Sequence, residues 1–131
     1  MKRHIWISIL YYFSAAYDGI LGLAFLFIPL SVFNWYGTTP PSHLGYVHFP
    51  AALLMLFAMM FINIARHPLR NYNLIPYGIL LKFSYCSVVF WHWFTGGIPG
   101  MWKPFAIFDI FFGVLFLWSY MILRAEIKEG Q

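Results

Sequence analysis

The sequence predicts an all-α fold: a polytopic membrane four-helix bundle with up-down-up-down topology and with both termini cytoplasmic. Of the 131 residues, 62% are hydrophobic and only 9% are charged, a balance that a soluble domain of this size cannot hide from water. The apolar residues gather in four segments separated by short polar or Pro/Gly-rich breaks. Lysines and arginines lie in alternate breaks, as the positive-inside rule requires.

A single domain, residues 1–131, accommodates all four segments. A hydrocarbon core of about 30 Å needs about 20 helical residues, so the segments have suitable lengths and the second is the shortest. Lys2 and Arg3 followed by apolar residues imitate a secretory signal, but the apolar run continues well past residue 16. We therefore expect an uncleaved first helix. The predicted helices span about residues 5–30, 47–65, 74–94 and 104–123.

The breaks between the segments contain turn-forming residues. The first, "SVFNWYGTTPPSHLGYVH", is rich in aromatic residues, which is typical of a segment at a membrane interface. "RHPLRNYN" is a tight basic turn, and the glycines of "TGGIPGMWK" end the third helix. Pro104 suits the first turn of the last helix, whereas Pro29 is expected to bend or stop the first one.

Positive charge gives the orientation. Lys2 and Arg3, Arg66 and Arg70, and Arg124 and Lys128 all fall on one side of a four-span chain, while the other side has Lys103. This predicts cytoplasmic termini in the inner membrane of a prokaryote, with the lipid bilayer as the main partner. The net charge of +4 is thus a topology signal, and no basic helix of the kind that binds nucleic acid is present.

Two carboxyl groups lie deep in the predicted membrane. Asp18 is about 20 Å from the cytoplasmic end of the first helix, and Asp109 is at nearly the same depth in the last. An acidic residue there costs roughly 2.5 to 3.5 kcal/mol, so each must be protonated, paired or turned toward a cavity. Small residues three and four positions away, such as Gly22 and Gly113, predict that both carboxyls point into the bundle.

The third helix adds a polar stripe. Lys82, Tyr85, Val89 and His92 follow one another at steps of three, four and three, which places them on one helix face. Two interpretations of Lys82 remain open: its long stem carries the ammonium to the inner interface, or the ammonium forms a salt bridge with Asp18. Tyr85 is expected beneath a cluster formed by the two carboxyls and the histidines.

His48 opens the second helix and His92 lies near the outer end of the third, so both are expected near the outer surface. They could be residues of the interfacial belt. Alternatively, they could be axial ligands to a haem, or metal ligands together with a carboxylate. The aromatic fraction of 23% is explained mostly by contact with lipid, although a flat ligand such as a haem or a quinone would also favour it.

The stretch "GILGLAFLFIPLSVFNWYG", followed by a second span ending in "IARHPLRNYNLIPYGILLKF" and by two further spans, resembles the small four-helix DoxX-like membrane families. The resemblance covers nearly the whole chain in helix count, in loop placement and in the basic turn from Arg66 to Arg70. It implies the four-helix fold and an association with membrane redox systems. It implies no catalytic residue.

These features lead to three functional hypotheses. The first is a small subunit of a membrane redox or energy-converting assembly, with a site for a quinone, haem or similar apolar cofactor near Asp18, Asp109, His48, His92 and Tyr85. A second is a proton-coupled transporter or channel that uses Asp18, Lys82 and Asp109 as a relay. The third is a structural accessory subunit, either beside a larger membrane protein or in a homo-oligomer. No hydrolase triad or phosphate loop is present, so a self-contained enzyme is not expected.

Overall fold

The computed structural model describes residues 4–130, and this part of the chain contains helices and no strand. The all-α prediction is therefore confirmed. Each of the four long helices is long and apolar enough to cross a membrane, judged by length and composition. These helices are α1 (Ile5–Phe27), α3 (Gly45–Arg66), α4 (Ile75–Thr95) and α5 (Trp102–Glu129). Two short elements complete the fold, namely α2 (Pro29–Trp35) and the 3-10 turn η2 (Tyr72–Leu74).

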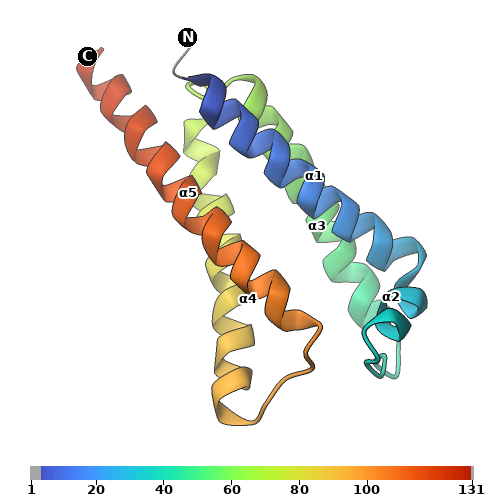
Figure 1. The fold of residues 1–131 in the computed structure, drawn as a ribbon. Coiled ribbons are helices and arrows are strands. Elements are labelled where there is room, and N and C mark those ends of the chain that lie inside the picture. The colour runs from blue at the N-terminus through green and yellow to red at the C-terminus, as the bar shows by residue number, and fades with distance from the viewer. Residues whose placement is uncertain (1–3, 131) are drawn as a thin grey trace.

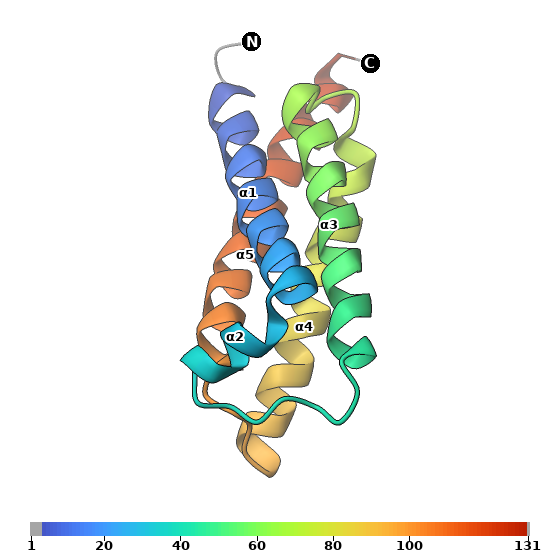
Figure 2. The same ribbon diagram turned by 90° about the vertical axis from the view of Figure 1, so that its right-hand side faces the viewer.

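Successive long helices run in opposite directions, so that α1 begins and α5 ends at the same end of the molecule, here called the terminal end (Figures 1 and 2). The ring of His4 lies 2.6 Å from the carboxylate of Glu126 at this end. Contacts are dense within two pairs, α1 with α3 and α4 with α5, and sparse between the pairs. The pairs lie closer together at the terminal end than at the opposite end, which holds α2 (Figure 1).

The first helix is shorter than predicted, because the segment expected at 5–30 forms two helices. Ile28 leaves the helical conformation, with φ −132° and ψ 47°, and Pro29 starts α2. A residue before proline is disfavoured in the α region, since the proline ring clashes with it. Pro29 then occupies the first turn of α2, where its missing N–H group has no cost.

The other helix boundaries differ from the predicted ones by a few residues, except at the end of α5. Helix α3 ends at Arg66, since His67 precedes Pro68 and leaves the helical conformation, with φ −144° and ψ 75°. Helix α5 reaches Glu129, six residues beyond the predicted end at 123. Hydrophobicity ends near Leu123, but the following residues are good helix formers, so the helix continues into a polar turn.

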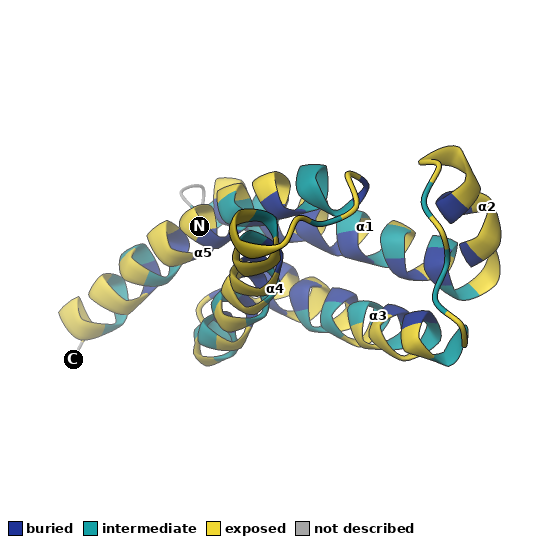
Figure 3. Ribbon diagram, turned by 90° about the horizontal axis from the view of Figure 1, so that it is seen from below, coloured by how far each residue is buried: buried dark blue, intermediate teal, exposed yellow. Residues whose placement is uncertain are grey.

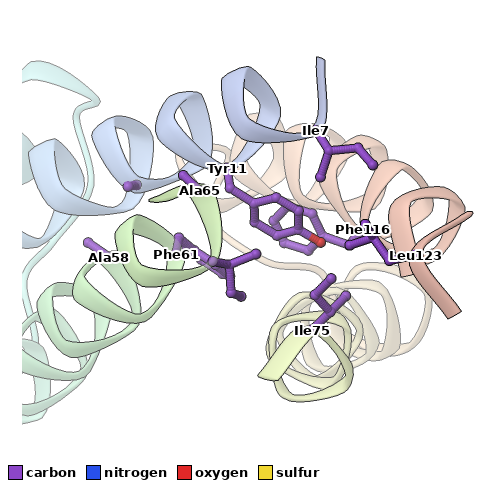
Figure 4. Packing of buried hydrophobic residues seen from close by; sticks show 10 residues of the cluster. Ile7, Tyr11, Ala58, Phe61, Ala65, Ile75, Phe116 and Leu123 are labelled. Atoms are coloured by element: carbon purple, nitrogen blue, oxygen red, sulfur yellow. The ribbon is translucent and has the colours of Figure 1, made fainter. Parts of the chain in front are cut away.

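An aromatic cluster fills the interior near the terminal end (Figure 4). The Tyr11 ring stacks on the Phe116 ring with centroids 4.7 Å apart, and the Phe61 ring lies 5.1 Å from that of Phe116. Buried residues line the inner faces of the helices, whereas exposed residues cover their outer faces (Figure 3). The exposed faces are rich in large apolar side chains, as expected for helices surrounded by lipid. The aromatic cluster closes the space between the pairs at the terminal end.

Candidate functional site

Asp18 is turned inward because small residues bring α1 close to α3. A Cβ atom on Gly22 would lie 2.9 Å from the carbonyl oxygen of Ala51 and 2.8 Å from Cγ of Met55. Ser14 and Ala15, one turn before Asp18, are also buried. The predicted small-residue surface around Asp18 is therefore confirmed, and it places the carboxyl group between the two helix pairs.

Three charged side chains from three helices meet in the middle of the molecule. The Lys82 ammonium, on α4, donates a hydrogen bond to Asp18 Oδ1 on α1 at 2.8 Å. It also donates one to Asp109 Oδ1 on α5 at 3.2 Å. The exposed fractions of the three residues are 0% for Lys82, 1% for Asp18 and 8% for Asp109. These residues are called the charged triad below.

The interpretation of Lys82 as a residue that extends to the interface is wrong. Its side chain stays inside because two carboxylates lie within reach, and hydrogen bonds between charged groups are strong in a medium of low dielectric. Aromatic rings complete its surroundings: Nζ lies 5.5 Å from the Tyr17 ring centroid, 5.3 Å from that of Phe112 and 5.8 Å from that of Phe61. Such distances permit cation–π attraction.

The charges of the triad do not balance. Two ionised carboxylates and one ammonium leave a net charge of −1. A buried net charge is costly, since the surroundings cannot solvate it as water does. In addition, Asp18 Oδ2 is buried and has no hydrogen-bond partner among the described residues. The triad can therefore accept one further positive species, such as a proton, which would neutralise its net charge and could bind Asp18 Oδ2.

A cavity of about 240 Å³ leads to the triad from the end that holds α2. Asp18 and Asp109 are the charged residues of its lining and Tyr85 also lines it, whereas Lys82 is not part of the lining. Tyr46, at the start of α3, also lines the cavity and is 74% exposed, so the cavity reaches the molecular surface there. The apolar walls include Phe25, Val47, Leu54, Trp102 and Phe105.

Tyr85 is fixed in the cavity wall by its hydroxyl group, which donates a hydrogen bond to the carbonyl oxygen of Trp102 at 3.0 Å. The Trp102 ring in turn stacks on the Phe25 ring with centroids 5.8 Å apart. The sequence interpretation missed Phe25 and Trp102 as wall residues. Their residue types carry no signal for it, because a lipid-facing surface uses the same aromatic side chains.

The two histidines do not join the site. Neither His48 nor His92 lines the cavity, and His92 is exposed. Among residues 4–130, no three His, Cys, Asp or Glu side chains are grouped so that they could hold a metal ion. Equal depth in the membrane does not imply the same direction around a helix axis. Of the predicted site residues, the structure brings together Asp18, Asp109, Lys82 and Tyr85.

Hydroxyl groups continue from the triad toward the terminal end. Tyr11, Ser14 and Asp18 share one face of α1, at steps of three and four residues. The Tyr11 hydroxyl is 2.7 Å from Ser119 Oγ on α5, and Ser14 Oγ is buried without a hydrogen-bond partner among the described residues. This hydroxyl row was not predicted, although its spacing along α1 is visible in the sequence.

Comparison with known proteins finds no matching family model, no similar curated protein and no similar solved structure. The resemblance to the DoxX-like families therefore stays a prediction. The class of protein that the geometry supports is an all-helical chain with four helices able to span a membrane and with a charged triad at the end of an apolar cavity.

Proposed function

We propose that the chain is a small proton-coupled transporter of a prokaryotic inner membrane, a four-span bundle with both termini cytoplasmic. The observation that carries the proposal is the unbalanced negative charge of the triad, placed where an apolar cavity ends. Burial makes that charge unfavourable, so the site is stabilised when it takes up a proton. Ionisable residues of this kind inside a membrane are typical of proton relays.

The architecture supports access from two sides. The cavity gives access from the end that holds α2, and the hydroxyl row of Tyr11, Ser14 and Ser119 leads toward the terminal end. Sparse contacts between the helix pairs favour a rocking motion of one pair against the other, which is a common mechanism of alternating access. In this mechanism, the aromatic cluster around Tyr11 and Phe116 must part for the site to open toward the terminal end.

The proposed orientation follows from charge at the two ends of the molecule. The terminal end of the molecule carries Arg66 and Arg70, at and just after the end of α3, and Lys128 in the last turn of α5. Lys103 lies at the opposite end, where its ammonium is 4.6 Å from the Trp93 ring centroid. An excess of Arg and Lys marks the cytoplasmic side. The cavity would then open toward the outside of the cell.

Proton flux into proteoliposomes tests the proposal. Vesicles loaded with a pH-sensitive dye receive an inward pH gradient, with the membrane potential clamped by potassium and valinomycin. With a mixture of small organic cations, anions and neutral solutes trapped inside, we expect faster acidification with the wild type than with protein-free (empty) vesicles, and acidification at the empty-vesicle rate with Asp18→Asn or Asp109→Asn. Glu129→Gln, the same chemical change at an exposed position, should behave as the wild type. A wild type no faster than empty vesicles would refute the proposal.

A second candidate function is a quinone site in a small subunit of a redox or energy-converting assembly. The observation that favours it is the aromatic wall of the cavity, which fits a flat ring, next to groups that can hydrogen-bond a polar head. Haem fits less well, since neither histidine lines the cavity. Stoichiometric quinone in extracts of gently purified protein, lost in Asp18→Asn, would support this candidate. Purified protein without quinone would count against it.

A further inference from the structure

We infer that the cavity takes a small lipophilic cation, an amine or ammonium with an apolar body, which replaces the proton at the charged triad. The inference rests on the proposed transport function and names its substrate class. It is carried by three observations: the net charge of the triad, the free oxygen of Asp18 and the composition of the cavity walls.

The charge of the triad makes the proton and a cation mutually exclusive. With both carboxylates ionised, the site carries −1, and either one proton or one monovalent cation brings it to zero. Both together would leave +1, which is again a costly net charge in an apolar environment. Binding of the cation therefore releases the proton, and this exclusion is the coupling that a proton-driven exchanger needs.

The position of Lys82 directs a cation to the carboxylates. Its ammonium lies outside the cavity lining, whereas Asp18 and Asp109 are part of it, so a ligand meets negative groups first. Asp18 Oδ2 is buried and unpartnered among the described residues, and it can accept a hydrogen bond from a protonated amine. Tyr85 already donates its hydroxyl proton to Trp102. The charged side chains of the lining are both carboxylates, so an anion would be repelled.

The walls suit a cation with an apolar body. Aromatic rings attract organic cations through their faces, and they also favour the burial of alkyl groups. The molecule already uses such rings around the Lys82 ammonium, at 5.3 to 5.8 Å. The cavity volume of about 240 Å³ is below the range of about 300 to 1,000 Å³ for drug-sized ligands. It therefore suits one ring or a few alkyl groups. The rings in the lining are those of Phe25, Tyr46, Tyr85, Trp102 and Phe105.

Calorimetry on the full-length protein in a non-ionic detergent tests the inference with two matched probes. Benzyltrimethylammonium carries the charge, and neopentylbenzene is its neutral isostere, with carbon in place of nitrogen. We expect the cation to bind at least tenfold more tightly than the isostere. We also expect its Kd to fall about tenfold per pH unit over the range in which the proton is still bound, because one proton leaves for each cation that binds.

Variants add a second comparison. Asp18→Asn and Asp109→Asn each leave one carboxylate to balance Lys82, so both should abolish the preference for the cation over the isostere. Glu129→Gln should keep it. The two wild-type measurements need no variant, so a variant that fails to fold does not decide the outcome.

The possible outcomes separate this inference from the proposed function. Equal binding of the two probes, cation binding that does not change with pH, or no binding of the cation would each overturn the inference. If Asp-dependent proton flux were still present, the transport function would stand with another substrate. A short-chain quinone that binds more tightly than the cation would also overturn the inference and would favour the second candidate function.

Discussion

Lys82 Nζ lies 2.8 Å from Asp18 Oδ1, and this hydrogen bond joins the two helix pairs in the middle of the molecule. Asp18 belongs to the pair of α1 and α3, whereas Lys82 belongs to the pair of α4 and α5. Backbone contacts between the pairs are sparse, and this ion pair is one of the polar side-chain contacts that connect them, besides Tyr11 with Ser119 and His4 with Glu126. A change in the charge state of this ion pair would therefore change how the two helix pairs are placed relative to each other.

Replacement of Lys82 by Met should destabilise the protein strongly. The variant leaves two buried carboxylates without a cation, and removal of one partner of a buried ion pair costs about 3 to 5 kcal/mol. Unfolding by SDS in mixed micelles, followed by circular dichroism, measures the loss.

The double variant Lys82→Met with Asp18→Asn is the control for this prediction. It leaves only Asp109, which a proton can neutralise, so we expect it to be more stable than Lys82→Met alone. If Lys82→Met were as stable as the wild type, the ion pairs would contribute nothing to folding.

Two glycines on α1 give a matched test of the close approach between α1 and α3. Gly22→Ala should destabilise the protein by about 1 to 3 kcal/mol, since the new Cβ would lie 2.9 Å from the Ala51 carbonyl oxygen. Gly19→Ala should be neutral or slightly stabilising, because its Cβ would meet Ala58 Cβ at an ordinary 3.7 Å. Thermal unfolding of both variants in one detergent checks the order. Equal stabilities would contradict the packing described for Gly22.

The hydrogen bond between Tyr11 and Ser119 should contribute modestly to stability. Tyr11→Phe keeps the stacked ring but removes the hydroxyl group that lies 2.7 Å from Ser119 Oγ. Ser119 retains its bond to the Phe116 carbonyl oxygen, so we expect a loss of only about 0.5 to 1.5 kcal/mol. A double-mutant cycle with Ser119→Ala isolates the pair. A coupling energy of zero would show that the bond does not stabilise the fold.

The orientation can be read from cysteine labelling in cells. Cys86 is buried and its Sγ donates to the Ala106 carbonyl oxygen, so Cys86→Ser provides a cysteine-free background that keeps the donor. In this background, an impermeant maleimide should label Thr39→Cys in intact cells. Lys128→Cys should react only after the membrane is permeabilised. The reverse pattern would place both termini outside.

The sequence was informative where local rules decide the structure. Lengths of apolar segments predicted the four long helices, and Pro29 predicted a break that the structure places at Ile28. The inward orientation of Asp18 and Asp109 followed from neighbouring small residues, because such residues allow close helix packing. These inferences need only the spacing of residues along one helix.

Other features depend on how helices are rotated and paired, which spacing along one helix does not determine. His48 and His92 lie near the ends of α3 and α4, as predicted, but outside the cavity lining. Lys82 had two open interpretations because the choice depends on two carboxylates that come from other helices. The wall formed by Phe25 and Trp102 was missed for the same reason, since it arises only when α1 and α5 meet.

The distribution of the triad over three helices has a consequence for biogenesis. In a membrane, each of α1, α4 and α5 would enter with its own unpaired ionisable group, at a cost of about 2.5 to 3.5 kcal/mol per residue. Asp18 is synthesised first, and its partner Lys82 follows 64 residues later in the chain. In a membrane, the hairpin of α1 and α3 would therefore hold Asp18 without its cationic partner until α4 is made, which favours a protonated or water-exposed carboxyl group at that stage.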